Sequence, residues 1–453
     1  MTVDRRRPPV AGSPSVPLMP ELASGRLVNG MEWFHVTRPG LPLIDLLIVL
    51  RAGIDLDPPE AAGLATLAAE LLEEGTALRS GLEIAARTDQ LGATLSIRPG
   101  WDETTVALHA LSARLRDGLE IAADVVRNPV FAESDVRRRR DERIGVLIQD
   151  GDEPAALVGR AISDAIYGAA HPYGQPARGT RRSVASIDRD RLAAFHRVRY
   201  GPGAAFVVSV GDTSAPEMER ALQAVFGDWS GSTEAIPAVP GAIRPSGMSL
   251  RLVDRPGAPQ SELRIGRAGP PRTTPDHARL VVLNTVLGGA FTSRLNLKLR
   301  EEKGFTYGAR STFLFRRGPG PFVAGAAVAT ADTAEALQDA LNEMDRLRQD
   351  PVPGPELERA KNYLTLSLPR RLETASAMAV KLANLHLHGL EPTELVAFVR
   401  RVREVGRQDL LDAAAEWLGP DRMSVAIVGD AAATRGPLEA LRIGAVESCE
   451  VEI

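Results

Sequence analysis

Histidine and cysteine do much of the acid–base, metal and nucleophilic chemistry of proteins, and this sequence contains few of them. It has seven histidines and one cysteine, Cys449. No two histidines are four residues apart, the spacing that puts two imidazoles on one helix face, and His386 and His388 would diverge on a helix. Cys449 lies in an acidic tail, which weakens a thiol as a nucleophile. The G-x-S-x-G and G-x-x-x-x-G-K-[ST] motifs are also missing, so the sequence favours neither a serine-hydrolase elbow nor a phosphate loop.

Strands and long helices alternate in blocks along the chain and would have to position any site. Strand pairs with grouped helices predict an α+β fold, in which the helices pack on one face of a mixed or antiparallel sheet. The predicted strands are 43–51, 93–98, 103–111 and 204–210, followed by 249–254, 260–266, 306–314 and 320–328. The predicted helices of the first half are 61–74, 81–91, 112–127, 133–150, 154–167 and 188–199.

The two halves of the chain resemble each other. Residues 186–212 (SIDRDRLAAFHRVRYGPGAAFVVSVGD) align without a gap with residues 404–430 (EVGRQDLLDAAAEWLGPDRMSVAIVGD). In each segment a helix ends at Gly-Pro and a strand ends at Val-Gly-Asp. A repeat of this length indicates two homologous domains rather than a solenoid. We therefore predict a flexible arm at 1–28, a domain at 29–230, a Pro- and Gly-rich linker at 231–247 and a second domain at 248–453.

Composition and charge exclude several other classes of protein. The chain has 453 residues, of which 44% are hydrophobic and 25% charged, as in ordinary globular proteins. The net charge, 54 − 58 = −4, argues against a nucleic-acid partner. No stretch is apolar enough for a membrane span. The N-terminus lacks the apolar region of a signal peptide, so we expect a cytoplasmic protein, or a periplasmic one if an upstream signal peptide was missed.

Three segments together resemble the pitrilysin/insulinase family of zinc metallopeptidases, the inverzincins. They are GLATLAAELLEEGT at 63–76, HPYGQPARGT at 171–180 and NTVLGGAFTSRLNLKLREEKGFTYGARS at 284–311. The resemblance extends from about residue 29 to residue 445 and includes the duplicated halves. It therefore implies an α+β fold made of two metallopeptidase-like domains.

The resemblance also implies the position of a zinc site, but the residues at that position are wrong for zinc. Family members carry H-x-x-E-H, in which two histidines bind zinc and the glutamate is the general base. Here the histidines are replaced by Thr66 and Glu70, and the base by Ala69. The third ligand, a glutamate in the family, is Gln149. One carboxylate with neutral oxygens suits harder ions, so we expect no zinc in this chain and a purely structural helix at 63–74.

A second site implied by the resemblance is preserved. Some family members work as pairs, in which one chain holds zinc and the other supplies an arginine and a tyrosine in the pattern R-x6-Y. Arg300 and Tyr307 match this pattern. Arginine can hold a substrate carbonyl and tyrosine can donate to a developing oxyanion. The alternatives are that Arg300 pairs with Glu301 or with helix-end carbonyls, and that Tyr307 is an ordinary sheet residue.

The resemblance further suggests that Gly288 and Gly289 form a flexible loop near the substrate, rather than an anion cradle. Together these features predict a zinc-free subunit of a heteromeric metallopeptidase, inactive alone. Its H-x-x-E-H partner would supply zinc, the base and a sheet edge to which an extended peptide adds. One alternative is a self-paired, noncatalytic peptide-binding or scaffold protein. Another is an unrelated hydrolase that uses carboxylates such as Glu70, Glu73 and Glu74.

Overall fold

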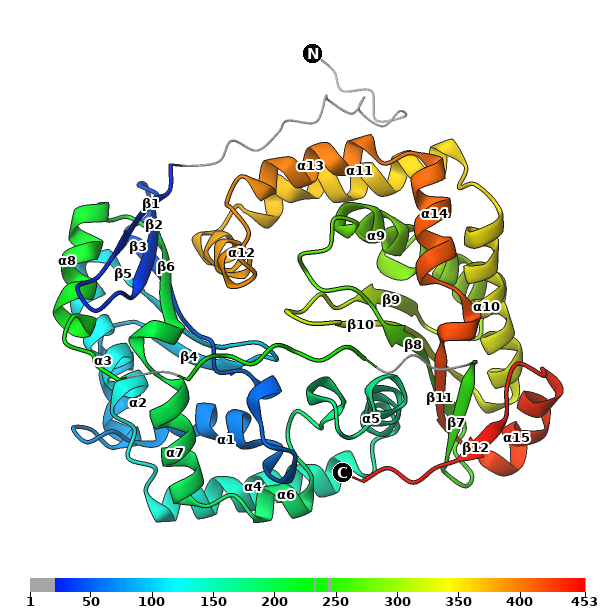
Figure 1. Cartoon of the computed structure of the whole chain (residues 1–453), viewed down its shortest axis with the longest axis horizontal. Helices are drawn as coiled ribbons and strands as arrows, with labels where there is room; N and C mark the ends of the chain where they lie inside the picture. The colour runs from blue at the N-terminus through cyan, green and yellow to red at the C-terminus, as the bar shows by residue number, and fades with distance from the viewer. Residues whose placement is uncertain (1–20, 232–233, 243–246, 453) are drawn as a thin grey trace, which may run out of the picture.

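The computed structural model describes residues 21–231, 234–242 and 247–452, which form two six-stranded mixed sheets flanked by helices (Figure 1). The first sheet has the strand order β1 (Ala23–Arg26), β2 (Glu32–Thr37), β6 (Ala205–Gly211), β3 (Leu43–Leu50), β5 (Thr104–Leu111) and β4 (Thr94–Pro99). The helices of this half are α1 (Leu64–Leu71), α2 (Gly81–Gln90), α3 (Leu115–Arg127), α4 (Glu133–Asp150), α5 (Pro154–Tyr167), α6 (Arg181–Ala185), α7 (Arg189–Arg199) and α8 (Ala215–Phe226).

The second half repeats this arrangement. Its sheet has the order β12 (Val446–Ser448), β7 (Ser249–Asp254), β11 (Ser424–Gly429), β8 (Gln260–Ala268), β10 (Pro321–Ala329) and β9 (Ala309–Phe313). Its helices are α9 (His277–Asn284), α10 (Thr333–Gln349), α11 (Gly354–Arg371), α12 (Ala375–Leu387), α13 (Glu394–Glu404), α14 (Arg407–Trp417) and α15 (Ala431–Ala440). Two π-helical segments, η7 (Thr285–Gly289) and η8 (Asn296–Glu302), follow α9.

The predicted α+β class with duplicated halves is confirmed. The two sheets share one parallel pair of strands, β2–β6 in the first sheet and β7–β11 in the second. The next three neighbouring pairs across each sheet are antiparallel, and equivalent strands occur in the same order along the chain. The outermost strands differ, because β1 runs antiparallel to β2 whereas β12 runs parallel to β7. The helices predicted at 133–150 and 154–167 have the predicted bounds.

Each sheet is partly covered on its second face by a helix from the opposite half. Helix α12 of the second half packs on β3 and β6 of the first sheet, where Leu382 joins Leu47 and Val49 in one apolar cluster (Figure 1). Helix α5 of the first half packs in the same way on β7, β8 and β11. This exchange explains why every residue of β6 and β11 is buried, since strands covered on both faces have no solvent-facing side.

A polar clamp also joins the halves, at the connection between β9 and β10. The backbone N–H of Arg317 donates to Asp102 Oδ2 at 2.6 Å, and the hydroxyl of Tyr173 donates to Asp102 Oδ1 at 2.7 Å. The guanidinium of Arg317 also pairs with buried Asp55. Burial raises the pKa of Asp55 to about 6, against the opposing effect of Arg317. The neighbouring Arg316 guanidinium lies 4.0 Å from the ring centre of Trp101.

The described part of the predicted linker is held by both halves. His171, in the HPYG segment, contacts the carbonyl oxygen of Pro240 through Nε2 at 3.0 Å. Arg317, from the second half, donates to the carbonyl of Pro237 at 2.7 Å. Residues 232–233 and 243–246 lie outside the described residues. The HPYG segment therefore has a structural role in fastening the connection.

The predicted start of the first domain at residue 29 is wrong. Residues 23–26 form β1, which pairs with β2 in the first sheet, so the first domain begins before that boundary. The Pro-rich composition that suggested an arm belongs to residues 1–20, which lie outside the described residues. Within the ranges that are described, no helix is long and apolar enough to cross a membrane.

The exchange of helices predicts a strong effect of truncating Leu382, which is 3% exposed between α12 and the first sheet. Leu382→Ala should lower the free energy of unfolding by roughly 2–4 kcal/mol, because it leaves a cavity between the halves. Val380 lies on the same helix but is 54% exposed, so Val380→Ala should change stability by less than about 0.5 kcal/mol. Urea unfolding of both variants tests this, and equal losses would contradict the exchange.

Candidate functional site

Arg300 lies on an irregular helix that leads directly into the strand following Tyr307. Helix α9 continues into η7, and η8 then carries Arg300 in its last turn. π-helical turns are rare and often occur at functional sites, because they rotate the side chains that follow. Gly304, with a φ of 68°, ends the helix, and its N–H donates to the carbonyl of Arg300 at 3.2 Å.

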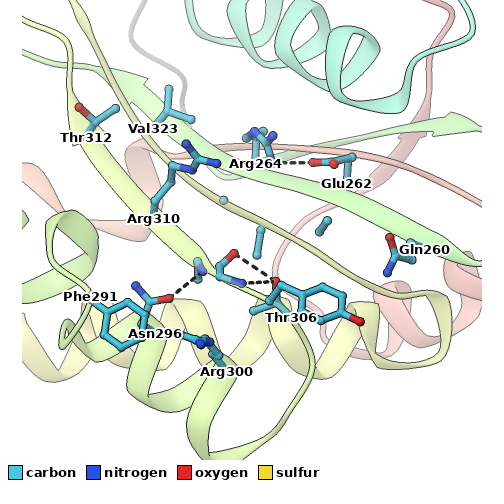
Figure 2. A pocket seen from close by; sticks show the side chains of 16 residues that line it. Gln260, Glu262, Arg264, Phe291, Asn296, Arg300, Thr306, Arg310, Thr312 and Val323 are labelled. Atoms are coloured by element: carbon cyan, nitrogen blue, oxygen red, sulfur yellow. Dashed lines mark hydrogen bonds and ion pairs between the residues drawn. The ribbon is translucent and has the colours of Figure 1, made fainter.

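Asn296 fixes the position of this helix relative to the strand. Its buried side chain accepts a hydrogen bond from the N–H of Ala309, the first residue of β9, at 3.0 Å. Its amide group donates to Ser293 Oγ and to the carbonyl of Ala290, both at 3.3 Å. Asn296 stands one helical turn before Arg300, and Ala309 stands two residues after Tyr307. One amide therefore fixes the distance between the two parts of the chain that carry the pair (Figure 2).

Arg300 and Tyr307 face the same cavity. The Arg300 guanidinium lies 4.4 Å from the ring centre of Phe291 and 3.6 Å from Glu301 Oε1. The pairing with Glu301 that the sequence allowed is therefore present, but it leaves the guanidinium partly exposed. Tyr307 is 95% exposed, and among the described residues no side chain or backbone group bonds to its hydroxyl. This exposed hydroxyl is available to a molecule outside the chain.

The cavity has a volume of about 750 Å³ and lies on the open face of the second sheet. Its floor consists of the outward-facing residues of β8, β9 and β10, and η8 forms the opposite wall (Figure 2). The burial pattern of β10 alternates along its length, as expected for a strand with one packed and one open face. The residues that line the cavity include Gln260, Glu262, Arg264, Arg310, Thr312, Val323 and Gly325.

The prediction that Gly288 and Gly289 form a flexible loop is wrong. Both residues belong to η7, and the irregular connection begins only at Ala290. Gly288 is buried, and a Cβ there would clash with the backbone nitrogen of Ser311 on β9. A Cβ on Gly289 would lie 2.6 Å from Asn284 Nδ2. Gly288 thus permits close packing of helix on strand, whereas Gly289 is exposed and lies closest to the preceding helix, and neither lines the cavity.

Two residues at the positions that the sequence resemblance implies for zinc ligands, Thr66 and Glu70, bond to other groups of the protein. Thr66, on α1, donates its hydroxyl to the carbonyl of Ala177. Glu70, one turn later, pairs with Arg143 of α4, whose side chain is only 6% exposed. Arg143 also donates to the carbonyl of Arg178 at 3.3 Å. The guanidinium therefore supplies positive charge to the carboxylate that replaces the second histidine.

These residues do not fit a zinc ion. Ala69 offers no ligand atom, and Gln149 is exposed on α4. The hydroxyl of Thr66 is neutral and already donates to a backbone carbonyl, whereas zinc prefers imidazole, thiolate or carboxylate ligands. In the parts of the chain that are described, no group of three or more His, Cys, Asp or Glu side chains is arranged to hold a metal ion.

Glu74 and His386, both named from the sequence, have structural partners. Glu74 pairs with Arg138 and Arg139, so this part of the acidic run binds α4. His386 packs against the rings of Phe34 and Phe206, with centroid distances of 4.4 and 4.5 Å, and contacts Glu32 at 3.0 Å. It belongs to the packing of α12 on the first sheet.

Sequence reasoning missed Asn296, Phe291, Arg264 and Arg310, which complete the site. The alternation of 309–313 (ARSTF) could have shown that Arg310 points away from the core, because Ala309 and Ser311 are buried while Arg310 is exposed. Nothing in the sequence signals Phe291 or Asn296, because their contacts depend on how η8 packs against β9.

Comparisons with known proteins agree with this architecture. Residues 44–180 match the family model described as Insulinase (Peptidase family M16), and residues 186–364 match the model described as Peptidase M16 inactive domain. An uncharacterized zinc protease of Mycobacterium leprae is 28% identical over 389 residues, covering 84% of this chain and 86% of the relative. One from Streptomyces coelicolor is 24% identical over 408 residues, covering 89% of this chain and 88% of the relative.

Solved structures show the same fold. A structure described as the peptidase M16 inactive domain from Pseudomonas fluorescens matches with a TM-score of 0.84 and 25% identity, covering 90% of this chain and 98% of that chain. A protease from Helicobacter pylori also gives a TM-score of 0.84, at 20% identity, and covers 90% of this chain and 100% of that one. This second likeness concerns the fold alone.

The chemistry at Thr66, Glu70 and Gln149 predicts that the purified chain holds no stoichiometric zinc. Elemental analysis after incubation with zinc and desalting should find well below one ion per chain, because one carboxylate already paired with arginine is a weak ligand. Glu70→Ala should not change the zinc content. One tightly held equivalent of zinc, lost in that variant, would contradict our interpretation of these positions.

A buried histidine at the start of α9 predicts how stability depends on pH. His277 packs against Phe315 and Phe398 and is surrounded by cationic groups. Burial, reinforced by Arg272, lowers the pKa of His277 to about 2. Lys381, Arg401 and His388 act in the same direction. Below about pH 6.5 this histidine takes up a proton in the unfolded chain but stays neutral in the folded chain. The free energy of unfolding therefore falls as the pH is lowered.

Between pH 6.5 and 5.0 the wild type should lose about 2 kcal/mol more unfolding free energy than His277→Gln, at about 1.4 kcal/mol per pH unit. Urea unfolding of both proteins at each pH measures this difference, and groups common to both cancel. Equal losses of unfolding free energy in the two proteins would show that His277 is protonated in the folded state.

Proposed function

Because this chain belongs to the insulinase (M16) family of peptidases, we propose that it is the zinc-free subunit of a heteromeric metallopeptidase that degrades or processes unfolded peptides. A partner of the same family would carry H-x-x-E-H and the zinc ion. This chain would supply part of the chamber wall, together with Arg300 and Tyr307. It would be inactive towards peptides on its own.

The observation that carries this proposal is the presence of two outward-facing donors beside one cavity. Arg300 and Tyr307 both line it, and the Tyr307 hydroxyl is free to bond to a molecule outside the chain. During peptide hydrolysis negative charge develops on the carbonyl oxygen, and a positioned hydroxyl stabilises that charge more than it stabilises the substrate. The guanidinium would hold a neighbouring carbonyl and orient the peptide.

The contacts of Thr66 and Glu70 support the same assignment of roles to two chains. Thr66 and Glu70 bond to Ala177 and Arg143, so α1 is a packed structural helix that brings no water-activating group to the chamber. The described part of this chain offers hydrogen-bond donors but neither a zinc site nor a general base at Ala69. Peptide hydrolysis would then need a second chain that supplies the metal ion and the base. That requirement favours a heteromer over an enzyme that acts alone.

The cavity also suits an extended substrate. Its floor is an open sheet face and its wall is a short helix, so that a peptide strand could lie between them. Backbone recognition of this kind favours unfolded chains over particular sequences. Because β9, which borders the cavity, is the last strand of its sheet, the peptide can approach from the side of the partner.

The role of Tyr307 can be tested in the reconstituted complex. The tagged chain is purified with its H-x-x-E-H partner, and hydrolysis of a fluorogenic peptide is followed with and without a chelator. Tyr307→Phe should lower kcat about a hundredfold and change KM less than about threefold, because the hydroxyl acts on the transition state. Arg300→Ala should lower kcat/KM as well, mainly through weaker peptide binding.

Tyr363 provides the matched control, since it is also a solvent-exposed tyrosine but lies on α11 and does not line the cavity. Tyr363→Phe should leave both constants unchanged. An unchanged kcat in Tyr307→Phe would remove the proposed role of the pair. If no H-x-x-E-H chain co-purifies and the protein pairs with itself, the self-paired scaffold or peptide-binding function takes its place.

A further inference from the structure

Two arginines stand in one row across the floor of the cavity, on either side of a glycine. Gly325 of β10 is paired in register with Arg264 of β8 on one side and with Arg310 of β9 on the other. Residues directly opposite each other in neighbouring strands project from the same face of a sheet. All three therefore face the cavity, and all three line it.

The glycine leaves room for the side chain of Arg264. A Cβ on Gly325 would lie 2.4 Å from the carbonyl oxygen of Leu263, 2.6 Å from Cδ of Arg264 and 2.9 Å from its Nη1, so any larger residue would displace backbone as well as that side chain. Nη1 of Arg264 donates to the carbonyl of Leu263 at 2.8 Å, and Figure 2 shows the Arg264 and Arg310 side chains on the same face of the sheet. Arg300 lies on the opposite wall beside Phe291.

The charges of this row are not balanced within the chain. Arg264 pairs with Glu262 at 2.9 Å. Arg310 is exposed, and within the described part of the chain it has neither an ion pair nor a hydrogen-bond acceptor. The charged residues that line the cavity are three arginines and one glutamate, which gives 3 − 1 = +2, whereas the whole chain carries −4. The positive charge is thus concentrated at this site.

We propose that Arg310, assisted by Arg264, forms a subsite that binds a carboxylate of the peptide substrate. This inference rests on the proposed function, because it assigns a ligand to another part of the same cavity. The guanidinium of Arg310 can form a bidentate pair with a carboxylate, which also relieves its repulsion from Arg264. Arg310 is a specificity residue and Arg264 adds positive charge beside it, whereas Arg300 and Tyr307 act at the scissile bond.

The carboxylate could come from an acidic side chain or from the C-terminus of the peptide. The two sources share the same chemistry, and two peptide changes separate them. One replaces a single glutamate by glutamine, and the other replaces the free C-terminus by an amide. Each change removes one negative charge and keeps the size of the peptide almost constant.

The test measures binding of a fluorescein-labelled ten-residue peptide to the purified full-length chain by fluorescence anisotropy. In the wild type, one of the two changes should weaken binding about fivefold, the effect of one partly exposed ion pair, and the loss should shrink in high salt. In Arg310→Gln the acidic and neutral peptides should bind equally. Arg197, exposed on α7 and outside the cavity, is the matched control, and Arg197→Gln should retain the fivefold preference.

Two results would overturn this subsite. One is a wild-type protein that binds the acidic, glutamine and amide peptides within twofold of each other. The other is a preference for the acidic peptide that persists unchanged in Arg310→Gln. The measurement needs no partner, so an inactive reconstituted complex would remove the peptidase proposal and leave the binding preference standing. An active complex without any carboxylate preference would remove only the subsite.

Discussion

Each sheet of this protein has a central strand that is apolar on both faces, and the helices of its own half cover only one of those faces. On the other face the central strand is covered by a single helix from the opposite half, α12 on the first sheet and α5 on the second. Neither half can bury its central strand without the other, since β6 and β11 are apolar on both faces. The two homologous domains therefore form one cooperative unit, and their relative orientation is fixed by hydrophobic packing.

The polar clamp at Asp102 connects the candidate site to this packing of the two halves. The connection between β9 and β10 binds the first half through Asp102, Tyr173 and Arg317, and the same two strands carry Arg310 and Gly325. A displacement of the halves would thus strain the strands that form the floor of the cavity. Polar groups at such a junction give orientation rather than large stability, because their desolvation offsets much of their attraction.

Duplication has given the two halves different chemistry on equivalent elements. In the first half, α1 follows β3 and is packed tightly, with Glu70 paired with Arg143. In the second half, the corresponding position after β8 is taken by α9 and the π-helical segments, which project Arg300 into an open cavity. A guanidinium can replace a metal ion as a source of positive charge, but it cannot activate water as a Lewis acid.

The sequence by itself determined the duplication, the family and most elements of the first half, but β1, β2, α6, α8 and most helices of the second half were not predicted. The helices at 133–150 and 154–167 and the gapless repeat at 186–212 depend only on local pattern, which explains why these predictions agree with the structure. Only the tertiary structure decided which helix covers which sheet, that Gly288 packs against Ser311, and that Arg310 joins Arg264 beside Gly325. These are contacts between residues distant in sequence or between neighbouring strands, and they depend on register and packing, which a local pattern does not encode.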